Sequence, residues 1–183
     1  MHHFARTLLP LLCLHLTACD LFDDETDVAG LIASQFVAIT VDGADVADGL
    51  LTSDGAVNPD NFLANLREQM GTIESVNVTR IALVASNTER VEVSKWADVY
   101  TGEVLVQLVP SSGGAPILVG KVNVPAFGLD PLSPSVQTSR EALDAVPDIA
   151  AGRFSVRLTA GTPRAATDAF KLPIRVEIEF IAF

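Results

Sequence analysis

Apolar and polar residues alternate along much of the chain after residue 34, and this is the period of a β-strand with one buried face. Strands are predicted at residues 35–42, 76–85, 100–109, 117–124, 153–160 and 172–183. In the first of these, Val37, Ile39 and Val41 form an apolar set opposite a mixed one. In the second, the phase of the alternation changes at Thr79-Arg80, which predicts a β-bulge.

A hairpin is predicted in the middle of the chain. Residues 110–116 (PSSGGAP) have the Pro, Gly and Ser content of a tight connection. The strands at 100–109 and 117–124 should therefore pair with each other.

The last two predicted strands carry opposite charges on their polar faces. Arg153 and Arg157 lie on one, and Glu177 and Glu179 lie on the other. Each opposite-charge pair across an antiparallel ladder contributes about 0.2–1 kcal/mol, so we expect these two strands to be neighbours.

Two segments have helical spacing instead. Asn58 suits the cap and Pro59 the first position of a helix, and apolar residues then recur on one side until a glycine ends the pattern. Those apolar residues are Phe62, Leu63, Leu66 and Met70. A shorter helix is predicted from Thr138, with Glu141 completing a capping box, to the residue before Pro147.

Strands separated by turn signals, with only two short helices, predict an all-β fold. We expect an antiparallel β-sandwich, immunoglobulin-like or jelly-roll-like, with the helices in its connections. Residues 34–183 would form one domain, and about 150 residues are enough to bury a core without disulfides.

The first 18 residues follow a different pattern. Arg6 precedes a run, TLLPLLCLHLTA, that is apolar apart from two threonines and one histidine. This is the form of a secretory signal peptide, and the run is shorter than the roughly 20 apolar residues of a membrane-spanning helix.

The run ends in Leu16-Thr17-Ala18-Cys19, which resembles the lipobox of bacterial lipoproteins. The resemblance covers residues 1–20 and implies cleavage before Cys19, lipidation of Cys19 and a location in the bacterial cell envelope, facing the periplasm or the cell surface. The acyl chains would then provide the anchor, and the domain itself would need no membrane-binding face. The alternative is ordinary cleavage at the same place, with Cys19 an incidental thiol.

Residues 19–33 would be the lipidated cysteine and a tether, because residues 20–27 (DLFDDETD) contain five acids among eight and such runs are solvated. The strand layout that follows also resembles uncharacterised sandwich domains of envelope lipoproteins. This second resemblance concerns the fold alone.

Composition restricts the chemistry. All three histidines and both cysteines lie within the first 19 residues. Removal of residues 1–18 would therefore leave no histidine and a single cysteine, Cys19. This excludes a Ser-His-Asp or Cys-His catalytic group, a His- or Cys-ligated zinc site and an intrachain disulfide. The net charge of −11 repels phosphates, so we expect no nucleic-acid partner.

Trp96 and Tyr100 are the only tryptophan and tyrosine in the chain. Exposed on a loop, they would stack on a sugar ring while Asp98 bonds its hydroxyls, as in carbohydrate-binding modules. The favoured interpretation is that they fill the core, because a sugar platform usually uses several aromatic residues.

Asp42, Asp45 and Asp48 form the densest set of oxygen ligands, which is the type that calcium prefers. Their spacing of three differs from the spacing of two in the known calcium loop, so solvated turn residues are the favoured interpretation.

No pair of carboxylates is distinguished by its setting, and we expect neither catalysis nor a cofactor. The sequence therefore predicts a lipid-anchored envelope protein that acts as a binding or structural module, with an envelope protein or a glycan as its partner. The alternatives are a carbohydrate-binding module and a calcium-stabilised, adhesion-type domain.

Overall fold

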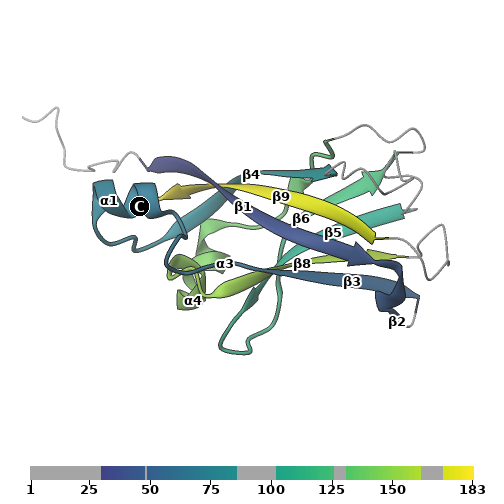
Figure 1. Ribbon diagram of the computed structural model, residues 1–183. Coiled ribbons are helices and arrows are strands. Elements are labelled where there is room, and N and C mark those ends of the chain that lie inside the picture. The colour runs from purple at the N-terminus through teal and green to yellow at the C-terminus, as the bar shows by residue number, and fades with distance from the viewer. Residues whose placement is uncertain (1–29, 48, 86–101, 126–130, 162–170) are drawn as a thin grey trace, which may run out of the picture.

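The computed structural model describes residues 30–47, 49–85, 102–125, 131–161 and 171–183, which fold into two antiparallel sheets packed face to face (Figure 1). The strands are β1 (Leu31–Asp42), β2 (Val46–Ala47), β3 (Leu50–Ala56), β4 (Val76–Ala85), β5 (Gly102–Pro110), β6 (Ile117–Val124), β7 (Ser135–Val136), β8 (Phe154–Gly161) and β9 (Lys171–Ala182). The helices are the 3-10 turn η1 (Gly43–Asp45), α1 (Ala64–Met70), α3 (Arg140–Asp144) and α4 (Pro147–Ala150). The predicted antiparallel sandwich with short helices in its connections is confirmed.

Sheet A has the strand order β1-β9-β4 within the described residues. Val37, Ile39 and Val41 of β1 are buried, as the alternation predicts. β1 begins at Leu31, before the predicted strand start at residue 35 and within the segment 19–33 that was predicted to be a tether. The register between β4 and β9 shifts between Val78 and Arg80, which confirms the predicted bulge.

Sheet B has the order β2-β3-β8-β5-β6-β7 in the same part of the chain. The predicted hairpin is confirmed, because β5 and β6 pair antiparallel on either side of residues 111–116. Every second residue of β8, from Phe154 to Ala160, faces the core.

The prediction that the last two strands are neighbours is wrong. β8 lies in sheet B between β3 and β5, whereas β9 lies in sheet A. The Arg157 guanidinium donates to both carboxylate oxygens of Asp54 on β3, at 2.7 and 2.8 Å. Arg153 pairs with Asp148, with 2.8 Å between Nη2 and Oδ1. Both arginines thus pair with acids other than Glu177 and Glu179. Complementary charges indicate that an acid lies near each arginine, but they do not determine which segment carries that acid.

Strand β3 was not predicted, and the reason lies in its inward face. Leu51, Ser53, Gly55 and Val57 point inward, so two of the four positions are small. A side chain at Gly55 would lie 2.6–2.8 Å from atoms of β1, and only glycine allows the two strands to approach so closely. This close crossing of β1 over β3 closes one side of the sandwich.

The first helix begins later than predicted. Asn58 accepts a hydrogen bond from the Asp60 N–H at 2.9 Å, but turns follow it, and α1 starts only at Ala64. Leu63 before it has a positive φ of 49°. This turn is what allows Phe62 and Leu63, adjacent in sequence, both to be buried.

The second helical segment is confirmed with a shifted cap. Ser139, not Thr138, caps α3 by accepting from the Ala142 N–H at 3.4 Å. Pro147 does not simply end the helical segment, because it is the first residue of α4.

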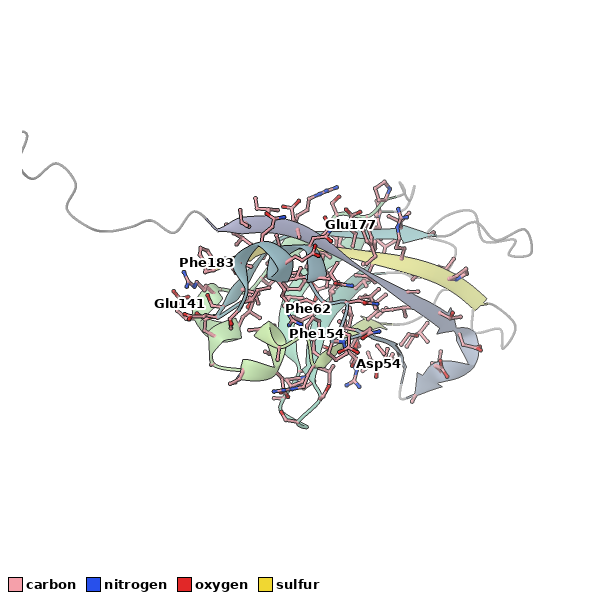
Figure 2. The ribbon with its side chains drawn as sticks, turned by 60° about the vertical axis from the view of Figure 1, so that its left-hand side comes forward. Asp54, Phe62, Glu141, Phe154, Glu177 and Phe183 are labelled. Carbon is pink, nitrogen blue, oxygen red and sulfur yellow. The ribbon has the colours of Figure 1, made fainter. Side chains whose placement is uncertain are left out.

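Three phenylalanine rings meet in the core, and Figure 2 labels two of them, Phe62 and Phe154. Phe62 meets Phe154 and Phe180 edge-on, with ring centroids 5.2 and 5.4 Å away. Gly152, with φ 72°, lies directly against Phe62. None of the helices in the described ranges is long and apolar enough to span a membrane.

Candidate functional site

The sandwich has two distinct ends (Figure 1). Helices α1, α3 and α4, the start of β1 and Phe183 gather at one end, here called the helical end. The Gly30 backbone lies so close to Ile181 and Phe183 that a side chain there would clash with both. At the opposite end, here called the far end, β1 and β4 finish and β9 begins.

The predicted sugar-stacking residues belong to the connection between β4 and β5. Trp96, Asp98 and Tyr100 lie outside the described residues, and so does Cys19. The strand ends on either side of the connection, Ala85 and Gly102, lie at the far end.

Two of the three candidate calcium ligands, Asp42 and Asp45, lie at the far end. Asp42 is the last residue of β1, half-buried and in register with Lys171, while Asp45 is exposed in η1 and Asp48 lies outside the described residues. In the part of the chain that is described, no three acidic, histidine or cysteine side chains are grouped to hold a metal. Calcium binding stays the alternative interpretation of these residues, and solvated turn residues stay the favoured one.

A polar cluster at the helical end is centred on Asp148, which is 8% exposed. Its Oδ2 accepts from the Ser112 N–H at 2.9 Å, and its Oδ1 accepts from the Arg153 Nε–H at 2.9 Å. The pKa of Asp148 is lowered, first by the hydrogen bond from the Ser112 side chain, then by Arg153 and the Ser112 backbone. The cluster fastens the loop of the β5–β6 hairpin to α4 and β8.

Two further charged groups have structural roles. Glu141 lies in the first turn of α3. Its pKa is lowered by a backbone hydrogen bond and by a hydrogen bond with the Ser139 side chain. The pKa of Arg157 is raised by its hydrogen bond to Asp54.

A groove of about 480 Å³ lies at the helical end. One wall is the end of α1 and the loop after it, and the other is α3 and α4. Its lining is Arg67, Gly71, Thr72, Ile73, Glu74, Leu143, Asp144, Val146, Pro147, Ala150 and Ala151. The sequence did not indicate this groove, because its walls lie about 70 residues apart in the chain and neither wall carries a motif.

Arg67 is held in a fixed position at this groove. Its Nη1 donates to the Pro59 carbonyl at 3.0 Å and its Nη2 to the Ala150 carbonyl at 3.2 Å, so it bridges the two walls. Its guanidinium also lies 5.7 Å from the centre of the Phe62 ring. Among the described residues no carboxylate forms a salt bridge with it.

Comparisons with known proteins do not extend this picture: no protein-family model matches the chain, and no curated protein matches it.

Proposed function

We propose that the chain is a lipid-anchored protein of the bacterial cell envelope whose sandwich acts as a binding or structural module without catalysis. The observation that carries the proposal is the sequence Leu16-Thr17-Ala18-Cys19, which follows Arg6 and an apolar run and resembles a lipobox. Two or more acyl chains on Cys19 would give stable attachment, because each buried methylene contributes about 0.8 kcal/mol.

The position of β1 supports an orientation for the anchored domain. Residues 20–30 separate Cys19 from the start of β1, and a segment of that length spans at most about 40 Å when extended. Since β1 starts at the helical end, that end would face the membrane. The far end would then face outward, toward partners in the periplasm or outside the cell.

Metabolic labelling with a radioactive fatty acid tests the anchor. Cys19→Ser should abolish incorporation, while Cys13→Ser, a change of the other cysteine in the chain, should leave it intact. Labelling that survives Cys19→Ser would overturn the proposal, and so would loss of labelling in both variants alike.

Glycan binding through Trp96, Tyr100 and Asp98 is the second candidate. It is favoured by the far-end position of Ala85 and Gly102, between which these residues lie in the sequence. Binding of the full chain to immobilised glycans should be lost in Trp96→Ala and kept in Phe36→Ala, which removes an exposed ring on β1. Equal binding by the two variants would exclude the candidate.

A further inference from the structure

The groove at the helical end is lined by charged groups of both signs, with Arg67 and Glu74 on the wall of α1 and its loop and Asp144 on the wall of α3 and α4. The half-buried guanidinium of Arg67 lies on one side, and the carboxylates of Glu74 and Asp144 also line the groove. Asp144 is paired with Arg140, at 3.4 Å between Oδ2 and Nε. Glu74 is exposed and forms no salt bridge with any described residue, so its carboxylate is available to a ligand.

Between these charges the groove is mainly aliphatic. Leu143 and Ile73 are buried at its base, and Val146, Pro147 and Ala150 complete the surface. A volume of about 480 Å³ lies within the range of small-molecule sites, which are mostly apolar with a few fixed polar groups.

We propose that this groove binds a small aliphatic zwitterion, such as an apolar α-amino acid. Its carboxylate would accept from the free N–H groups of Arg67, its ammonium would donate to Glu74, and its side chain would cover Val146 and Pro147. The proposal does not depend on the lipid anchor or on the glycan candidate.

The charge arrangement favours a zwitterion over either ion alone. A simple carboxylate would meet Arg67 but would also be repelled by Glu74, Asp144 and the negative net charge of the chain. A simple amine would meet Glu74 but would be repelled by Arg67. Only two of the five N–H groups of Arg67 donate to carbonyls, so the guanidinium is positioned in advance and can still bind a carboxylate.

Calorimetric titration of the purified full chain with leucine tests the proposal. Saturable binding is expected with a Kd of about 1 mM or tighter. Isocaproate, which lacks the ammonium, and isoamylamine, which lacks the carboxylate, should each bind about tenfold more weakly, because one hydrogen bond to a charged group is lost. Titration without saturation would overturn the proposal. Saturable binding of phosphoethanolamine but not leucine would also overturn it, in favour of a lipid headgroup.

Variants of the groove make the test specific. Glu74→Gln should weaken leucine binding about tenfold, because the ammonium loses its partner. The same change should leave isocaproate binding no weaker or strengthen it, because isocaproate has no ammonium and is no longer repelled by a carboxylate at position 74. Glu68→Gln is the matched control, since Glu68 is exposed on α1 outside the groove lining. Equal leucine affinities in these two variants would refute the assigned ammonium contact.

Thr72→Trp tests the location without disturbing the core. Thr72 is exposed and lines the groove, so an indole there should fill it and abolish leucine binding while the melting temperature stays unchanged. Leucine binding that survives this change would place the ligand elsewhere and overturn the proposal.

Discussion

Replacing Phe62 with alanine should remove a large part of the packing at the helical end. The ring is fully buried and meets Phe154 and Phe180 edge-on. Truncating a buried phenylalanine to alanine costs about 3–5 kcal/mol. In a domain of this size 1 kcal/mol corresponds to about 2–4 °C, so the melting temperature should fall by about 6–20 °C.

Phe62→Leu separates the aromatic contribution from the hydrophobic one. Leucine retains much of the apolar volume but neither edge-on contact, and each such contact is worth about 0.5–1.5 kcal/mol beyond burial. The expected loss is therefore about 1–3 kcal/mol, between those of the wild type and of Phe62→Ala.

The matched control is the same truncation at Phe36, which is 52% exposed on β1. Within the described chain, the one ring or cation contact of Phe36 is with the Arg175 guanidinium, which lies 5.5 Å from the ring centroid. Phe36→Ala should therefore cost about 1 kcal/mol or less. Urea unfolding followed by far-ultraviolet circular dichroism gives the free energy of unfolding of each variant. Equal losses for Phe62→Ala and Phe36→Ala would refute the packing described for the three rings.

Three further predictions concern charge and close packing. The lowered folded-state pKa of Asp148 means that its charged form stabilises the fold above the unfolded-state pKa of about 4, and that this stability is lost as pH falls through the folded-state value. Urea midpoints should consequently fall less steeply on acidification in Asp148→Asn than in the wild type, and parallel curves would contradict this. Gly113→Ala should cost about 1–2 kcal/mol of folding free energy, because its φ is positive. Gly152→Ala should cost more, because a side chain there would have a positive φ and would also lie 2.5 Å from Phe62. Equal urea midpoints for these two variants would contradict the clash with Phe62. Gly55→Val should cost about 1–3 kcal/mol by overpacking against β1 and should speed amide hydrogen exchange in that strand, so exchange that is unchanged would argue against the close crossing.

Alternation predicted the strands well where the buried side chains are large. In β9 the alternate buried residues fix the inward face, because a shift by one position would bury Arg175, Glu177 and Glu179. In β1, Val37, Ile39 and Val41 form the more apolar of the two faces. The bulge at Thr79-Arg80 could be read for the same reason. The alternation of apolar and polar residues did not predict β3, because Ser53 and Gly55 occupy inward positions there and the apolar pattern is lost.

Strand neighbours and the groove depend on contacts that the local pattern does not contain. The last two predicted strands do carry opposite charges, but Arg157 pairs with Asp54 and Arg153 pairs with Asp148. The groove needs Arg67 on one segment and the turn at Pro147 on another, and only the packed fold brings them together. Cys19, Asp48, Trp96, Asp98 and Tyr100 lie outside the described residues, so the roles assigned to them remain predictions.

The position of β9 has a consequence for how the chain is made. β9 follows every other described strand in the sequence, yet it lies in the middle of sheet A, between β1 and β4. Leu31 pairs with Ala182, so this sheet depends on contacts of very high sequence separation, which form slowly. A chain delivered from its amino end would therefore leave β1 and β4 without their ladder partner until residues 171–182 arrive. A truncation before Lys171 would leave β1 and β4 permanently without that partner, with unpaired strand edges open to aggregation.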